Sequence, residues 1–409
     1  MPRAGVACSV KRGGNGTKVG GKGAGKVDTE GGGKRAGKRG TEGGGKGGGT
    51  RGGNGAKVGT EVGTEFIADV VEGLEEVARV ELATIGARAV QAAEGGLRFS
   101  FRGTATRLAA LTTVQAVSLA LRFDVPRPKS LLGDEHFRRL VASVRAVART
   151  GRFDGFRFAA AGVGSSVFQR LADALAGATG LPYLPEDGEL LLRFRPDRER
   201  DRWEVLVRLT PRPSSTRAWR VCNRPGGLNA TVAAAMNDLV GSGDADRYLN
   251  LMCGGGTLLV ERALAGPAAR IVGVDLDREA IACARVNLRA AGVVERVELA
   301  VADVTRLALP GDEAFPAGSF DVLVADAPWG DAVGHHRENL TLYPALLEAA
   351  ARLAAPGARF ALLSHEVRLT RTLLAASTRW RVEHSFQIGH GGHHPLLSVL
   401  NRVGDGPDT

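Results

Sequence analysis

The pattern of apolar and polar positions changes twice along the chain and so predicts three regions. Residues 1–64 hold almost no large apolar side chains. From Phe66, short apolar runs alternate with amphipathic stretches, and over 74–85 the apolar residues fall on one face of a helix. From Leu228 onward, apolar strands and helical stretches alternate strictly. The pattern therefore predicts one region without a core and two folded regions of different architecture.

The middle region predicts two small α+β units that hold an antiparallel sheet. Strands are expected over 66–71, 97–101, 117–123, 156–160, 190–194 and 203–209, and helices over 74–85, 106–114, 135–148 and 166–178. Two prolines and two serines in 211–217 indicate a linker. We assign 65–125 to the first unit and 126–215 to the second unit with its linker.

The C-terminal region, 216–403, predicts a doubly wound, mostly parallel sheet. Strands are expected over 247–251, 270–275, 297–301, 320–325, 360–364, 379–386 and 396–402, with helices between them. In such a sheet the ligand crevice lies at the carboxyl ends of the strands.

Residues 1–64 are expected to be a disordered tail. The segment is dominated by glycine, and RGGNGTKVG at 12–20 recurs as RGGNGAKVG at 51–59. Such a composition cannot bury enough apolar surface to offset chain entropy. The tail could be a flexible cationic arm that contacts phosphates, or a dispensable extension; we favour the extension.

Charge does not identify a partner for the folded part. The formal net charge is +10, but residues 1–65 hold thirteen basic and five acidic side chains, which leaves 41 basic and 39 acidic ones elsewhere. The folded part is therefore near neutral.

Cysteine spacing excludes the usual metal sites and disulfide frameworks. The four cysteines, Cys8, Cys222, Cys253 and Cys283, stand far apart, so we expect no disulfide framework, no metal and a reducing cytoplasm. The histidines of 390–394 are expected in an exposed hairpin loop. No apolar run reaches the length of a membrane span.

A glycine turn is the first candidate for chemistry. Asn250-Leu-Met-Cys-Gly-Gly-Gly-Thr257 stands between a strand and a helix expected over 258–265. Glycines let the backbone approach a ligand closely, and a helix N-terminus offers free N–H groups. The candidate cofactor-binding residues here are Asn250, Cys253, Gly254 and Gly256. Alone, such a cluster can also be an ordinary tight turn.

Two further acids end the next two strands. Asp275 ends IVGVD, where a carboxylate can accept hydrogen bonds from both hydroxyls of a ribose. Asp303 follows the third strand, where a carboxylate can accept from an adenine amino group. With the residues after them, Leu276 and Val304, they complete the predicted cofactor site. The alternative for Asp275 is a helix N-cap, a role that Asp277 suits better.

The fourth strand ends in Asp326-Ala-Pro-Trp-Gly330. The Asp326 carboxylate and the Ala327 carbonyl can accept hydrogen bonds from both N–H groups of an exocyclic amine, while Pro328 stiffens the turn. Trp329 can stack on a base, a contact typically worth roughly 1–3 kcal/mol. The four features are spaced by 21, 28 and 23 residues, and together they predict a methyltransferase with a nucleoside cofactor.

These motifs resemble the THUMP-containing class I RNA methyltransferases. LNLMCGGGTLLVERAL is similar to their first motif, DAPWG to their Asn/Asp-Pro-Pro-Tyr/Phe/Trp motif, and TRAWRVCNRPGGLNATVAAAMNDL to their arginine segment, which helps hold the methionine end of the cofactor. FIADVVEGLEEVARVELATIG resembles their opening strand and helix, and FRFAAAGVGSSVFQRLADALAG their THUMP domain. The resemblance covers residues 64–403. Asn250, Gly255 and Ala327 stand where the family has Asp, Ser and Pro.

The resemblance implies a Rossmann-like methyltransferase domain preceded by a ferredoxin-like unit and an RNA-binding THUMP unit. It implies S-adenosylmethionine as cofactor and the N2 amine of a guanosine as acceptor, in tRNA or, in some relatives, in 23S rRNA; we favour tRNA. We expect the protein to be a monomer, and its cysteine usage and lack of an apolar span favour the cytoplasm. The alternatives are an adenine-N6 methyltransferase, since the same turn serves any exocyclic amine, and a catalytically silent RNA-binding relative.

Overall fold

The computed structural model describes residues 64–197, 202–309, 312–328, 336–389 and 391–404. The expectations for the tail over 1–63, for Trp329 and for His390 therefore lie outside the described residues. No described helix is long and apolar enough to cross a membrane.

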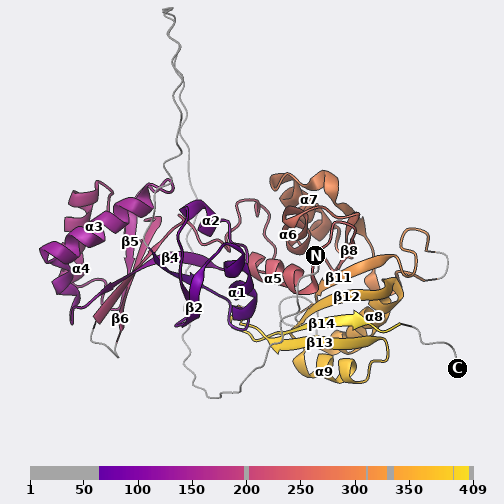
Figure 1. Ribbon diagram of the computed structural model, residues 1–409. Coiled ribbons are helices and arrows are strands. Elements are labelled where there is room, and N and C mark those ends of the chain that lie inside the picture. The colour runs from indigo at the N-terminus through magenta and orange to yellow at the C-terminus, as the bar shows by residue number, and fades with distance from the viewer. Residues whose placement is uncertain (1–63, 198–201, 310–311, 329–335, 390, 405–409) are drawn as a thin grey trace, which may run out of the picture. The chain divides into compact units, whose positions relative to one another are not determined.

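The N-terminal sheet has seven strands in the order β2-β3-β1-β4-β7-β6-β5. The first unit supplies β1 (Glu65–Asp69), β2 (Arg88–Ala93), β3 (Gly96–Ser100) and β4 (Ala116–Phe123), with α1 (Glu75–Thr84) and α2 (Ala105–Ala109). The second supplies β5 (Phe156–Ala159), β6 (Leu190–Asp197) and β7 (Arg202–Arg208), with η1 (Pro128–Leu132), α3 (Asp134–Ala148) and α4 (Ser166–Thr179). Because β4 pairs with β7, one sheet runs through both predicted units (Figure 1).

The structure corrects the sequence-based elements in two places. Strand β2 was not expected, because its residues are mostly exposed and alternate weakly between apolar and polar. The pair β5–β6 is parallel, so the sheet is mixed rather than antiparallel. Parallel neighbours need a crossover, and α4 supplies it.

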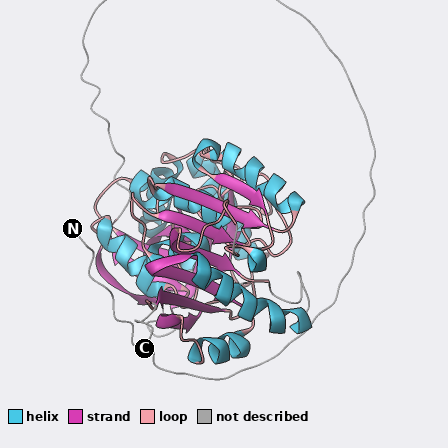
Figure 2. Ribbon diagram, turned by 90° about the vertical axis from the view of Figure 1, so that its right-hand side faces the viewer, coloured by secondary structure: helices cyan, strands magenta, loops and turns pink. Residues whose placement is uncertain are grey.

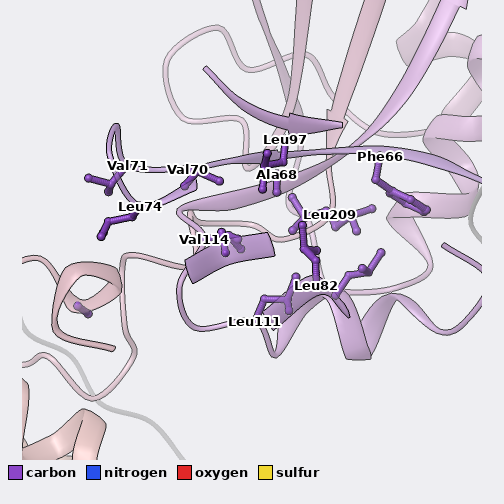
Figure 3. Close-up of a cluster of buried hydrophobic side chains, with 14 of the residues drawn as sticks. Phe66, Ala68, Val70, Val71, Leu74, Leu82, Leu97, Leu111, Val114 and Leu209 are labelled. Carbon is purple, nitrogen blue, oxygen red and sulfur yellow. The ribbon is translucent and has the colours of Figure 1, made fainter. Parts of the chain in front are cut away.

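The core of this region lies between the sheet and its helices. Strand residues Phe66, Ala68, Leu97 and Phe99 join Ala78 and Leu82 of α1 in one buried cluster. Figure 3 shows part of it, with Ala68 and Leu97 from adjacent strands above Leu82. The period of two along the strands therefore buries one face.

The C-terminal sheet has the order β10-β9-β8-β11-β12-β14-β13. Its strands are β8 (Arg247–Leu251), β9 (Arg270–Asp275), β10 (Glu298–Val301), β11 (Phe320–Asp326), β12 (Ala354–Ser364), β13 (Trp380–Gln387) and β14 (Leu396–Arg402). The first five are parallel, and β14 is antiparallel to both β12 and β13. This is the Rossmann-like arrangement that the alternation predicts.

Helices cover both faces of the C-terminal sheet, as Figure 2 shows. Residues of α5 (Ala230–Val240), α6 (Thr257–Ala265) and α7 (Arg278–Ala290) pack with Tyr248 and Val322 on one face. Residues of α8 (His336–Leu353) and α9 (Val367–Ala375) pack with Leu249 and Leu323 on the other. Neighbouring strand residues thus enter opposite cores, which explains why these strands are apolar throughout.

The cysteine expectation is wrong for one pair. Cys222 and Cys283 form a disulfide with a Cα–Cα distance of 5.5 Å, although 61 residues separate them. Spacing along the chain could not reveal this, because the loop before α5 meets α7 only in the folded domain. Cys253 is a free, buried thiol. Cysteine usage therefore no longer argues for a reducing compartment.

Candidate functional site

A cavity of about 640 Å³ opens at the carboxyl ends of β8, β9, β10 and β11. It is lined by the loop before α5, by the glycine turn after β8, by the acids that end the next strands, and by the start of α8. Parallel strands bring these segments to one sheet edge, although they are far apart in the chain.

The glycine turn is fixed by its neighbours. Met252, Gly254 and Gly256 all have positive φ angles, of 59°, 53° and 79°. Gly254 donates its N–H to Asp275 Oδ2 at 2.7 Å, and Cys253 donates its N–H to the Val274 carbonyl at 2.8 Å. A Cβ on Gly254 would meet nothing within 4 Å, whereas one on Gly256 would lie 3.0 Å from Ala284 Cβ. Gly254 thus faces open space, and Gly256 allows α6 to pack against α7.

Asp275 holds two backbone donors at the cavity wall. Besides the Gly254 bond, its Oδ1 accepts from the Asp277 N–H at 3.0 Å. Asp277 caps α7 by accepting from the Glu279 N–H at 2.8 Å, so the N-cap role falls to Asp277 as predicted. A carboxylate oxygen has two lone pairs, so Asp275 can still accept from ligand hydroxyls.

Asp303 follows β10, the strand next to β9, and lines the same cavity. Its Oδ1 accepts from both the N–H and the hydroxyl of Thr305, at 3.0 and 2.7 Å, and so caps the short helix η3 (Val304–Arg306). Its second oxygen is therefore the one left for a ligand amino group.

The loop before α5 is clamped to the glycine turn by Asn287 of α7, a residue 2% exposed. Its Oδ1 accepts from the N–H groups of Val221 and Cys222, at 3.1 and 2.9 Å. Its Nδ2 donates to the carbonyls of Cys222 and Gly255, at 3.0 and 2.9 Å. The disulfide to Cys283 fastens the same loop one helical turn away.

Arg220 brings a cation to this wall. It donates to the Leu228 carbonyl and to Thr257 Oγ1 at 2.8 Å, and its guanidinium lies 5.5 Å from the Trp219 ring centre. Burial lowers the pKa of Arg220. Its Nε is buried without a hydrogen-bond partner among the described residues. An unmatched donor in a cavity that Asp275 and Asp303 also line fits the nucleoside cofactor predicted from the sequence, which has a carboxylate at one end.

The turn after β11 lines the cavity beside the glycine turn, because β11 and β8 are neighbouring parallel strands. Asp326, Ala327 and Pro328 all line it. The Ala327 N–H donates to the Leu363 carbonyl at 3.0 Å, and the Pro328 carbonyl accepts from the Tyr343 hydroxyl at 3.2 Å. Asn339 Nδ2 lies 3.5 Å from the same carbonyl and 3.0 Å from Glu366 Oε1. Burial raises the pKa of Tyr343 to about 12, so its hydroxyl stays a donor.

Most of the predicted site residues surround this one cavity. Nine of them line it: Cys253, Gly254, Asp275, Leu276, Asp303, Val304, Asp326, Ala327 and Pro328. Two do not. Gly256 faces α7, and Asn250 is 1% exposed, with an Oδ1 that has no hydrogen-bond partner among the described residues. Asn250 therefore lies behind the cavity wall instead of in it.

Cys253 lines the cavity without being a nucleophile. Burial raises the pKa of its thiol well above the usual range, with a further contribution from Asp275. A thiol that keeps its proton does not attack an electrophile.

Sequence reasoning missed the residues that come from other segments. Arg220, Arg224, Asn287 and Asn339 line the cavity but were not assigned to the site. The arginine segment 216–239 pointed to the first two. Asn287 and Asn339 lie inside amphipathic helices, where only a buried polar position marks them.

The comparisons with known proteins agree with this geometry. Residues 217–395 match the RMKL-like methyltransferase domain family. A tRNA (guanine(6)-N2)-methyltransferase of Thermus thermophilus is 29% identical over 238 residues, 58% of this chain and 68% of the relative. The U6 snRNA (guanine-N(2))-methyltransferase THUMPD2 of Bos taurus is 35% identical over 113 residues, 28% of this chain.

The chain spans only 21% of the length of that bovine relative. Among solved structures, TrmN from Thermus thermophilus superposes with a TM-score of 0.66 at 23% identity, over 83% of this chain and 100% of that one. A putative methyltransferase, SMU.472, solved with SAH, gives a TM-score of 0.59 at 16% identity, over 82% of this chain and 97% of that one. Residues 217–395 of this chain are therefore similar to the RMKL-like methyltransferase domain, and the chain shares its Rossmann-like fold with TrmN.

Proposed function

We propose that the protein is an S-adenosylmethionine-dependent RNA methyltransferase that modifies the exocyclic N2 amine of a guanosine in tRNA, acting as a monomer. One observation carries the proposal. Asp326 lines the same cavity as the glycine turn, Asp275 and Asp303. An amine held by Asp326 and a nucleoside cofactor would therefore lie next to each other in one cavity.

Residues on the cofactor side would each hold a different part of the ligand. Asp275 has lone pairs left for the ribose hydroxyls, and Asp303 has a free oxygen for an adenine amino group. The unmatched Arg220 Nε suits the carboxylate of the methionine end. When bound, S-adenosylmethionine supplies an electrophilic methyl group.

On the acceptor side, the chain orients an amine. The Asp326 carboxylate and the Ala327 carbonyl accept hydrogen bonds from its two N–H groups, which directs the nitrogen lone pair toward the methyl group. Fixing both reactants in line lowers the entropy cost of the reaction, and the Asp326 carboxylate can take up the proton that the nitrogen must lose once it carries the methyl group. Trp329 stays a sequence-based prediction for stacking on the base. A base inside a folded RNA must be flipped out to reach this cavity.

The choice of acceptor rests on the names of the relatives. Both are guanine-N2 methyltransferases, and the one that matches the larger part of this chain acts on tRNA. The second candidate is adenine-N6 transfer, because the Asp326 turn can hold any exocyclic amine.

The test is methyl transfer from isotope-labelled S-adenosylmethionine to unmodified tRNA, U6 snRNA and 23S rRNA transcripts, followed by nucleoside mass spectrometry. We expect labelled N2-methylguanosine in tRNA, and no label with Asp326→Ala. Label in N6-methyladenosine would select the second candidate. Cofactor binding without label in any RNA would identify a catalytically silent relative.

A further inference from the structure

One face of the N-terminal sheet carries no helix among the described residues. Phe66, Leu119 and Val207 are neighbours across β1, β4 and β7, and they share a buried cluster with residues of α1, α2, α3 and α4. These helices therefore lie on the face of those residues. Alternate residues, such as Ile67 and Leu206, point to the other side, which we call the open face.

Arginines occupy the centre of the open face. The Glu204 carboxylate, 6% exposed, accepts from Arg98 Nη2 at 2.6 Å and from Arg195 Nη2 at 2.7 Å, while Arg122 Nε lies 3.7 Å away. Ile67 and Leu206 are at most 2% exposed although no described helix packs on them. We attribute their burial to the aliphatic stems of these arginines. The centre of the face is thus rigid and charged instead of apolar.

Arginines that lack a close acidic partner among the described residues lie toward the edges of the open face. Arg88 on β2 is opposite Ser100, and Arg157 on β5 is opposite Leu191. Neither forms an ion pair with a described residue within 4.0 Å, and Arg193, whose side chain is 44% exposed, has only Asp69 at 3.7 Å. Burial, with a smaller contribution from the like charges of Arg157 and Arg193, lowers the pKa of Arg208 to about 10. The three cations therefore lie close enough to interact electrostatically.

A hollow of about 200 Å³ marks the same part of the face, with Arg193, Arg208, Asp69 and Ser118 in its wall. Arg88 and Arg157 stand on opposite edge strands of the seven-stranded sheet. At about 4.8 Å between strands, they are roughly 29 Å apart. A ligand that reaches both must be an extended polyanion and not a single nucleotide.

We propose that the open face binds the sugar–phosphate backbone of the RNA substrate, with Arg88, Arg157 and Arg193 as phosphate contacts; this rests on the RNA substrate proposed above. The guanidinium plane matches two phosphate oxygens. The folded part as a whole is near neutral, so arginines without acidic partners on one face mark a place where charge favours RNA.

The test compares two triple variants that change the net charge equally. R88Q/R157Q/R193Q alters the open face, and R138Q/R149Q/R170Q alters exposed arginines on or at the end of α3 and α4, on the other face. Binding of an unmodified tRNA transcript is measured from 50 to 200 mM KCl with S-adenosylhomocysteine present. Loss of three phosphate contacts should flatten the log–log salt dependence by about two units and weaken binding about tenfold to a hundredfold.

We expect that loss for the open-face variant alone, with S-adenosylmethionine affinity unchanged as evidence of folding. Equal behaviour of the two variants would overturn the proposal, as would a wild-type protein that binds no tRNA. If the wild type binds tRNA through the open face but methylates no RNA, the surface stands and the proposed activity fails.

Discussion

The Tyr343 hydroxyl donates to the Pro328 carbonyl at 3.2 Å, directly behind the turn that carries Asp326. The same hydroxyl accepts from Ser364 Oγ at 3.3 Å. Ala327 occupies the place of a first proline, so the turn lacks one of its stiffening rings. A donor fixed in the core takes over part of that restraint by holding the next carbonyl away from the cavity.

Tyr343→Phe should therefore slow methyl transfer more than it weakens binding. A net hydrogen bond contributes about 0.5–1.5 kcal/mol, so we expect kcat to fall roughly threefold to tenfold. The KM values for cofactor and RNA should stay within error, because neither ligand touches Tyr343 in the proposed arrangement. Ser364→Ala, which leaves the Pro328 bond intact, is the matched control. A variant that lost only thermal stability, at an unchanged kcat, would make Tyr343 purely structural.

Asn287→Ala should damage both stability and cofactor binding. It removes four hydrogen bonds and leaves two backbone N–H groups of the cavity loop without their acceptor. With about 1–3 kcal/mol for each of the two buried unsatisfied groups, the free energy of unfolding should fall by about 2–6 kcal/mol. Denaturant titration measures it. Asn287→Asp keeps the acceptor for both N–H groups, and should recover part of the loss; no difference between the two variants would refute this account of the clamp.

The fold could be predicted from the sequence further than the site could. Continuous apolar runs located β8, β9 and β14 with their observed bounds, because strands that are buried on both faces are apolar almost throughout. It missed β2, whose pairing with β3 does not depend on an apolar face. The acids Asp275, Asp303 and Asp326 could be predicted to lie together, because the carboxyl ends of parallel strands meet at one edge of the sheet. Asn287 and the Cys222–Cys283 pair could not, since they depend on how a helix and a distant loop pack.

Asp275→Ala should weaken S-adenosylmethionine binding by roughly 1.5–3 kcal/mol, the scale of hydrogen bonds to a charged group. The structure adds a second consequence, because Asp275 also accepts from the N–H groups of Gly254 and Asp277. Some loss of thermal stability should accompany the loss of affinity. Asp275→Asn keeps one acceptor oxygen and should fall between the two in calorimetry. Unchanged affinity in a folded Asp275→Ala protein would remove this residue from the cofactor site.

The disulfide makes the stability of the protein sensitive to reductant. Cys222 and Cys283 close a loop of 61 residues, and loops of this size typically gain about 2–4 kcal/mol from a cross-link. Dithiothreitol should therefore lower the melting temperature of the wild-type protein, while the double variant Cys222→Ser, Cys283→Ser should melt lower and respond little to reductant. Because Cys222 belongs to the loop that lines the cavity, reduction should also weaken S-adenosylmethionine binding.

The buried Cys253 offers a control, since Cys253→Ala removes a thiol without touching the cross-link and should leave the reductant response intact. A wild-type melting temperature that does not respond to dithiothreitol, together with two free thiols more than Cys8 and Cys253 account for when the unfolded chain is alkylated without reductant, would show that the pair is reduced in solution.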